Sequence, residues 1–323
     1  MGLRFMQRDQ KTINFIFTDH AIRYLEVKQR SPLIVQQYGE RLLDSGIIKD
    51  GRIIDKQHLT LILQNIVDEL GVKKRPVRFI VPDSTIAIRK LTIPSDIRDD
   101  EVKGYIFLEI GTTIHLPFEE PNFDVVILPG KNKKKEVLLV ATEEEVIQSY
   151  LSLLEDVSLK PEVADVSPLS LYRLYYKNNF IHENDHVMLL HFDESLLTIS
   201  IFHQHIPLFM RPIAINEDED VSLSSLTQNS VENNEIYQLD EIVKDIGQIM
   251  SFYQFTIQKG EHQVNRILLS GDHSQRNMIR EYLTDRLEIS IDQLPSEVFQ
   301  PSSDVTIPRS YSIALGLGLK EVH

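Results

Sequence analysis

The hydrophobic pattern of the chain repeats itself in its two halves. An apolar run at Thr12–Phe17 is followed by a polar turn and a second β-rich run at residues 22–27. The same arrangement recurs at Val187–Phe192, where the turn Asp193-Glu194-Ser195 leads into residues 196–201. Two short runs rich in β-branched and aromatic residues around a polar turn predict a β-hairpin. Because each hairpin is followed by a strand, an amphipathic helix and a buried strand, the pattern predicts one α/β unit built twice.

Helical periodicity and capping residues predict where several helices begin and end. Asp55 is a suitable N-cap for an apolar stripe that ends at Gly71, and Thr142 with Glu145 has the spacing of a capping box. Ser167-Pro168 is a cap followed by proline at the first helical position. The predicted helices span 55–71, 142–157, 167–175, 242–257 and 274–287, and further strands are predicted at 77–81, 123–128, 136–142 and 266–270.

Composition narrows the class of protein. A chain of 323 residues is long enough for two domains with their own cores. Its longest apolar runs are far below the roughly 20 residues that a membrane span needs, and the polar residues 1–11 do not resemble a signal peptide. The absence of cysteine fits a reducing cytoplasm, and a net charge of −14 argues against generic nucleic-acid binding. We therefore expect a cytoplasmic globular protein.

Three stretches depart from the duplicated pattern. Residues 91–142 interrupt it and predict a small inserted subdomain. Residues 216–238 are acidic and rich in serine and asparagine, which predicts a mobile surface loop. The lysine-rich residues 131–135 predict a solvated hairpin turn, with a basic partner site as the alternative. The predicted domains are a first lobe at 1–80 plus 156–182, an inserted subdomain at 81–155 and a second lobe at 183–323.

A duplicated fold of this kind resembles actin-like and sugar-kinase-like proteins, which hold a nucleotide between the two turns. A series of short motifs, in order and at matching spacing, resembles the PilM family of type IV pilus assembly proteins. The resemblance covers nearly the whole chain and is strongest in its first half. Its motifs include Val81-Pro82-Asp83-Ser84, Leu91-Thr92-Ile93-Pro94, Phe107-Leu108-Glu109, Leu116-Pro117-Phe118-Glu119-Glu120 and Ala314-Leu315-Gly316-Leu317.

The resemblance implies both a fold and a function. The fold is a two-lobed actin-like α/β fold, a duplicated ribonuclease H-like unit related to the cell-division protein FtsA, with a small α+β subdomain inserted in the first lobe. PilM-like proteins lie at the cytoplasmic face of the inner membrane. They hold the cytoplasmic tail of the membrane protein PilN in a groove between the first lobe and the inserted subdomain. They commonly bind ATP with magnesium and act as assembly scaffolds.

The phosphate-binding turns depart from the family pattern. The family has Asp-x-Gly in the first turn, where the aspartate orients magnesium and the glycine lets backbone N–H groups approach phosphate. Here Ile16 and Thr18 occupy those two positions. In the second turn His191 and Asp193 occupy them. An acidic side chain directed at a triphosphate is repulsive.

The adenosine side of the pocket has changed as well. A run of glycines after a strand is reduced to Ser270-Gly271-Asp272, and Gln248-Ile249 replaces an Arg-Ser pair on the preceding helix. We therefore expect that no nucleotide cofactor is used. The alternatives are that ATP binds through backbone groups, or that magnesium is held from a shifted position by a neighbouring carboxylate. The remnant cleft comprises Thr18, Asp19, Asp193, Glu194 and Gly271.

The expected function is that of a cytoplasmic scaffold in a type IV pilus, competence or type II secretion-like machine, peripheral to the inner face of the membrane. Its partners would be the tail of a PilN-like protein and other motor or platform components of the pilus. The alternatives are a nucleotide-dependent, filament-forming FtsA-like protein and a GspL-like secretion component. The partner groove is expected to include Ile86, Ile88, Leu91, Ile93, Ile114, Leu116 and Phe118.

Other chemistry has little support in the sequence. His203-x-His205 places two imidazoles on one face of a strand, which suits a metal site or an exposed strand equally well. Without a third ligand nearby we predict no metal site. His191 could act as a general base, but a histidine hydrogen-bonded at the end of a buried strand is the simpler interpretation. Neither a Gly-x-Ser-x-Gly elbow nor a P-loop occurs. We expect no catalytic residues, although weak ATPase activity stays open.

Overall fold

The computed structural model describes residues 12–30, 33–129, 134–215, 228–300 and 306–321, with the side chains of residues 228–238 left out. Contacts along the backbone divide the chain into two compact units. The first unit comprises the described parts of Met1–Leu174, Gln300–Ile307 and Tyr311–His323, and the second comprises Tyr175–Phe299 and Pro308–Ser310.

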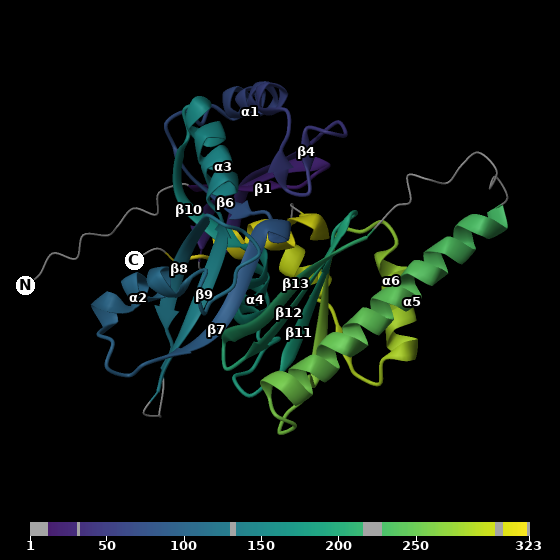
Figure 1. The fold of residues 1–323 in the computed structure, drawn as a ribbon. Helices are drawn as coiled ribbons and strands as arrows, with labels where there is room; N and C mark the ends of the chain where they lie inside the picture. The colour runs from purple at the N-terminus through teal and green to yellow at the C-terminus, as the bar shows by residue number, and fades with distance from the viewer. Residues whose placement is uncertain (1–11, 31–32, 130–133, 216–227, 301–305, 322–323) are drawn as a thin grey trace, which may run out of the picture. The chain divides into compact units, whose positions relative to one another are not determined.

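The first unit is built on a five-stranded sheet with the strand order β10-β6-β1-β2-β3. The central strand β1 runs antiparallel to β2 and parallel to β6 (Figure 1). All six residues of β1 are buried, as expected for a strand covered on both faces. The strands are β1 (Thr12–Phe17), β2 (Ala21–Arg30), β3 (Leu33–Leu42), β6 (Pro76–Val81) and β10 (Lys160–Val166).

The second unit repeats this arrangement with the order β13-β12-β11-β14-β15. Its central strand β11 runs antiparallel to β12 and parallel to β14. The same order and the same strand directions confirm the duplication that the sequence predicts. The strands are β11 (Val187–Phe192), β12 (Leu196–His203), β13 (Ile206–Ala214), β14 (Arg266–Gly271) and β15 (Ile291–Asp292).

Helices of the first unit follow the predicted boundaries in part. Helix α1 (Lys56–Leu70) begins where the carboxylate of Asp55 accepts the N–H of His58, and it ends at Gly71 with a left-handed φ of 64°. The prediction of a capping box at Thr142 and Glu145 is wrong, because α3 (Glu144–Asp156) begins without a side-chain cap. Thr142 pairs with Ile86 in a sheet, which keeps its backbone extended. Helix α4 comprises Ser167–Lys177, and a short hairpin joins β4 (Ile48–Lys49) to β5 (Arg52–Ile53).

The inserted subdomain has its own sheet and core. The antiparallel order is β7-β9-β8, formed by β7 (Ile86–Ile93), β8 (Pro121–Ile127) and β9 (Lys135–Glu143). Helix α2 (Val102–Glu109) belongs to the same segment, and its buried Val102 and Ile106 pack in the subdomain core. Helix α3 belongs to the lobe instead, because its Tyr150 packs on Phe17 and Phe79 of the first sheet. The subdomain thus spans 86–143, a narrower segment than 81–155.

Both long helices of the second unit differ from the sequence expectation. Helix α5 (Gln228–Phe252) begins earlier than 242 and continues into a π-helical turn at Tyr253–Ile257. Helix α6 (Arg276–Arg286) begins after 274, without a side-chain cap. Of the predicted loop at 216–238, residues 216–227 lie outside the described residues and 228–238 are helical. Ile236, Leu239 and Val243 have helical spacing, which the polar composition conceals. In the described part of the chain, neither α5 nor any other helix is long and apolar enough to cross a membrane.

The lysine-rich turn is only partly described, since residues 131–133 lie outside the described residues. Lys135 is the first residue of β9. Its ammonium group donates to the carboxylate of Asp99 at 2.6 Å and to the carbonyl of Ile97 at 2.5 Å. This lysine therefore ties the end of the hairpin to the segment before α2.

The C-terminal helix α7 (Ser312–Gly318) packs against the first sheet, and all seven of its residues are buried. Its glycines permit close contacts with α4 and with β2. A Cβ at Gly316 would lie 2.0 Å from the carbonyl oxygen of Ser170, and one at Gly318 would lie 2.5 Å from Val27. Residues 311–323 are therefore grouped with the first unit, whereas the sequence expectation placed them in the second lobe. Residues 175–182 are grouped with the second unit.

A buried arginine holds the end of α7. Arg78 of β6 is 3% exposed, and its guanidinium donates to the carbonyls of Leu317 and Lys320 at 3.3 and 2.6 Å. A cation at a helix C-terminus also interacts favourably with the helix dipole. Nearby, the buried carboxylate of Asp165 pairs with Arg173 and Lys320. This group of charges binds the last helix to the first lobe.

We predict that Arg78→Met lowers the free energy of unfolding by about 2 kcal/mol, because two buried carbonyls lose a charged donor. Urea unfolding followed by circular dichroism measures the change. The matched control is Arg41→Met, which removes an exposed ion pair with Glu69 and should cost about 0.5 kcal/mol or less. Equal effects of the two substitutions would contradict the assigned role of Arg78.

Candidate nucleotide cleft and partner groove

The first turn joins β1 to β2 and closes on itself. Thr18 donates its N–H to the carbonyl of Ala21 at 2.9 Å, and the N–H of Ala21 donates to the Thr18 hydroxyl at 3.1 Å. Thr18 therefore fills the family's glycine position with a side chain that forms the turn. Ile16, at the aspartate position, is 4% exposed and belongs to the packed interior. Neither position presents a carboxylate to a metal ion.

Asp19 is engaged by the backbone of a neighbouring hairpin. Its two carboxylate oxygens accept the N–H groups of Asp50 and Gly51 at 2.6 and 2.9 Å. Asp50 and Gly51 form the turn between β4 and β5 and have φ values of 51° and 75°. Asp19 thus stabilises this strained turn, and both of its oxygens have backbone donors.

The second turn, between β11 and β12, is also closed by its own atoms. Asp193 donates its N–H to the carbonyl of Leu196 at 2.8 Å, and its carboxylate accepts the N–H of Glu194 at 2.8 Å. His191 lies opposite Ser270 on the parallel strand, and its Nδ1 is 2.8 Å from the Ser270 hydroxyl. The geometry of His191 is that of a hydrogen-bonded histidine at a strand end.

The loop from β14 to α6 has no backbone donor left between Asp272 and Arg276. The N–H groups of Asp272 and His273 donate to the carbonyl of Phe192 at 3.0 and 3.2 Å. The N–H of Ser274 donates to the carboxylate of Glu194 at 3.0 Å. The N–H of Gln275 donates to the ring of His273 at 3.2 Å, and the N–H of Arg276 donates to the carbonyl of His273 at 3.0 Å. Successive N–H groups of this kind are what bind phosphate in other proteins, and here the chain itself accepts all five.

Gly271 has a structural reason to be glycine. Its φ is +120°, and a Cβ at this position would lie 1.9 Å from the carbonyl oxygen of Phe192. The last residue of β14 therefore approaches β11 too closely for any side chain. This contact accounts for the one glycine that remains of the family's adenosine motif.

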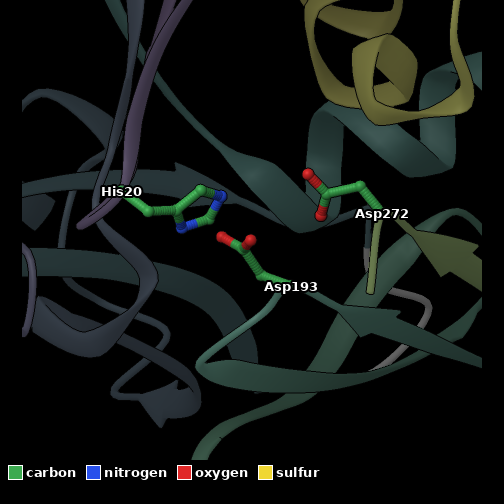
Figure 2. A group of neighbouring side chains, drawn as sticks. All are labelled: His20, Asp193 and Asp272. Atoms are coloured by element: carbon green, nitrogen blue, oxygen red, sulfur yellow. The ribbon is translucent and has the colours of Figure 1, made fainter. Parts of the chain in front are cut away.

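Charged side chains gather where β11 and β14 end. Figure 2 shows Asp193 and Asp272 on the loops that follow these strands, and their carboxylate oxygens approach within 4.8 Å. These two residues of the second unit are the ones that could share a cation. His20, labelled in the same view, belongs to the turn after β1 in the first unit. Arg276 begins α6, and burial together with the charges of Arg309 and Arg280 lowers its pKa.

The predicted groove residues divide into two groups. Ile86, Ile88, Ile93 and Ile114 are at most 9% exposed, so their side chains are packed in the interior of the first unit. Leu91 is partly buried against the subdomain core. The structure brings Leu116 and Phe118 together at a pocket of about 560 Å³. Its lining consists of Ile110, Gly111, His115, Leu116, Pro117, Phe118 and Glu119.

The sequence prediction missed two exposed apolar side chains on α2. Phe107 is 66% exposed and Leu108 is 74% exposed, and they precede the pocket residue Ile110 in the chain. The helical spacing of the sequence contained a signal for this surface. Val102 and Ile106 lie on the buried face of the short helix, and Phe107 and Leu108 lie outside that face. Adjacent exposed apolar side chains of this size mark candidate interaction surfaces.

The expectation that His203 and His205 lie on one face is wrong. Strand β12 ends at His203, and Gln204 and His205 form the following turn with φ values of 50° and 63°. The ring of His203 stacks on His186, whereas the ring of His205 contacts Tyr176. The reversal of the chain separates the two imidazoles.

Comparison with protein families gives a match over residues 16–216 to the model described as "Type IV pilus assembly protein PilM". The chain belongs to the PilM family. This confirms the resemblance found in the sequence motifs. A search of curated proteins gives no match to the chain.

Solved structures show that this PilM family member has the actin-like fold. The "PilM-PilN type IV pilus biogenesis complex" matches with a TM-score of 0.79 and 16% identity, over 96% of this chain and 99% of the other. The cytoplasmic domain of EpsL from the Vibrio cholerae type II secretion system matches with a TM-score of 0.52 and 9% identity, over 97% of this chain and 96% of the other. MreB5 of Spiroplasma citri, bound to ADP, matches with a TM-score of 0.50 and 9% identity, over 96% of this chain and 95% of the other.

We predict that Glu194→Ala lowers the free energy of unfolding by about 1 kcal/mol, because the Ser274 N–H loses its acceptor near the start of α6. Glu194→Gln retains an acceptor and should lose less. Urea unfolding followed by circular dichroism measures both. Glu281→Ala, on the exposed side of α6, is the matched control, and a loss as large as that of Glu194→Ala would refute the role of Glu194 as the acceptor for this loop.

Proposed function

We propose that this PilM family member is a non-enzymatic scaffold of a type IV pilus or related machine, which binds the cytoplasmic tail of a PilN-like membrane protein at its inserted subdomain. The observation that carries the proposal is the pocket lined by Ile110, Gly111 and residues 115–119, which follow the exposed Phe107 and Leu108 in the chain. The match to a complex of PilM with PilN supports the choice of partner.

The chemistry of the pocket suits a short peptide with an apolar anchor. Leu116, Pro117 and Phe118 supply apolar surface, and Glu119 adds a carboxylate at the same pocket. An extended segment gains most of its affinity from burying a few side chains in such pockets, together with backbone hydrogen bonds. Strand β8 offers such bonds, because within the described residues it pairs with β9 alone and forms an edge of the subdomain sheet.

The hydrogen bonds of the cleft support a scaffold that does not use ATP. The five N–H groups of residues 272–276 already have acceptors, and Thr18 and Asp193 replace the two glycines that would admit phosphate. The residues present therefore do not fit a magnesium nucleotide, and the protein carries out its function without one. Attachment to the membrane comes from the partner, which places the scaffold at the inner face of the cell membrane.

Calorimetric titration with a peptide that copies the tail of the PilN-like protein tests the whole proposal. We expect binding with the same Kd in the presence and absence of Mg-ATP, because the peptide site lies in the subdomain and the cleft has no role. Binding that requires Mg-ATP would instead favour a nucleotide-dependent, FtsA-like protein. A peptide that fails to bind in both conditions would refute the scaffold proposal.

A substitution in the pocket tests the site itself. Phe118→Ala should weaken peptide binding about tenfold, because an aromatic side chain that anchors a peptide is typically worth more than 1 kcal/mol. The matched control is Leu61→Ala, which removes an apolar side chain that is 65% exposed on α1. Circular dichroism melting checks that both variants are folded. Equal affinities of the two variants would place the binding site elsewhere.

A further inference from the structure

Three histidines form a stack near the start of β11 in the second unit. The rings of His186 and His203 are nearly parallel, with an interplanar angle of 11° and centroids 3.8 Å apart. The ring of His262 lies 4.8 Å from that of His186. His186 is 5% exposed, whereas His262 is exposed. The three residues come from the start of β11, the end of β12 and the loop before β14.

The hydrogen bonds of His186 indicate which of its nitrogens carries a proton. The hydroxyl of Tyr253 accepts a hydrogen bond from the side-chain amide of Gln258 at 3.0 Å. Its own hydrogen is then directed at His186 Nδ1, which is 2.6 Å away. We therefore assign Nδ1 of the neutral ring as the acceptor, with the ring proton on Nε2.

Protonation of His186 would place a hydrogen on Nδ1, opposite the hydrogen of Tyr253. The Tyr253 side chain is fully buried, so its hydroxyl would have to give up its acceptor. A buried hydroxyl without an acceptor destabilises the folded state. The new charge would also lie against the face of His203.

The charges around the stack favour the neutral ring. Burial, and then the neighbouring His203 and His262, lower the pKa of His186 to about 4, with Asp185 acting in the opposite direction. Burial raises the pKa of Tyr253 to about 12, so its hydroxyl keeps the hydrogen that it donates. Among the described residues, four titratable groups face the His186 ring. Asp185 precedes it in the chain, His203 ends β12, His262 lies in the loop before β14, and Tyr253 begins the π-helical turn.

The stack is not arranged as a metal site. The lone pair of an imidazole nitrogen lies in the plane of its ring, and the planes of His186 and His203 are parallel and face one another. One ion cannot lie in both planes. The Nδ1 of His186 is also occupied by the Tyr253 hydroxyl.

Tyr253 connects this stack to an unusual part of α5. It is the first residue of the π-helical turn at Tyr253–Ile257, which directly follows α5. Single π-helical turns are rare and frequently lie at functional sites. Phe255 in the same turn is 66% exposed, so Tyr253 supplies the buried aromatic anchor of this segment.

We propose that the stack of His186, His203 and His262 is an acid-sensitive latch, which holds the π-helical end of α5 to the base of the second sheet while His186 is neutral. The latch is independent of the proposed scaffold function. Because the pKa of His186 is lowered on folding from its ordinary value of 6.5, the neutral ring contributes stability that is fully present above pH 6.5. This contribution is lost as the pH falls from 6.5 towards 4.

Hydrogen exchange of the amides in residues 253–258, corrected for the intrinsic effect of pH, tests the latch. If the opened segment has a His186 pKa of 6.5, the opening constant of the wild type should rise about 30-fold between pH 7.5 and pH 5.0. His186→Asn places an amide oxygen close to the position of Nδ1 and does not titrate. The variant should therefore keep an acceptor for the Tyr253 hydroxyl, and its opening constant should rise much less than that of the wild type between pH 7.5 and pH 5.0.

Two further variants separate the latch from a purely structural role. His205→Asn changes an exposed histidine of the neighbouring turn and should retain the 30-fold rise. Tyr253→Phe should raise the opening constant already at pH 7.5, because the hydrogen bond to His186 is lost, which provides a readout if His186→Asn does not fold. The latch is refuted if wild-type exchange is equal at the two pH values, if His186→Asn remains as acid-sensitive as His205→Asn, or if Tyr253→Phe leaves the opening constant at pH 7.5 unchanged.

Discussion

Each half of this protein depends on one buried strand that pairs in opposite directions on its two sides. β1 is antiparallel to β2 and parallel to β6, and β11 has the same relation to β12 and β14. The hairpin turn and the loop after the parallel neighbour must therefore emerge at the same end of the sheet. In open α/β sheets the carboxyl ends of the strands are where ligands bind. The polar atoms around Asp193 and Asp272 meet there because the strand directions require it.

Polar groups at the ends of β11 and β14 form contacts within the protein. The Glu194 carboxylate lies near the positive end of α6, where a phosphate group would be favoured. A side chain attached to the adjacent turn is present at a high effective concentration and needs no ligand in solution. The loop between β14 and α6 is thus ordered by the chain itself. Asp19 plays a similar part in the first unit by holding the β4–β5 turn.

The features that local sequence determines were predictable. Asp55 and Gly71 bound a helix because a cap and a left-handed glycine act over a few residues. The hairpins and the PilM-like fold could likewise be read from the chain. Contacts between distant residues could not be read in this way. Thr142 has the spacing of a cap, but its pairing with Ile86 keeps it in a strand. The candidate pocket at Leu116 and Phe118 depends on how the segment after α2 folds back, and hydrophobicity alone did not separate these residues from the buried isoleucines.

The position of α7 has a consequence for how the protein is made. The helix that completes the packing of the first sheet is encoded after nearly all of the second unit. Arg78 can form its hydrogen bonds only after carbonyls more than two hundred residues further along the chain have been synthesised. A ribosome releases the chain from its N-terminus, and domains generally fold in that order. Here the second sheet is complete before the final helix has been synthesised. The lobe that begins first is therefore finished last, because α7 must be synthesised before it can cover β1 and β2.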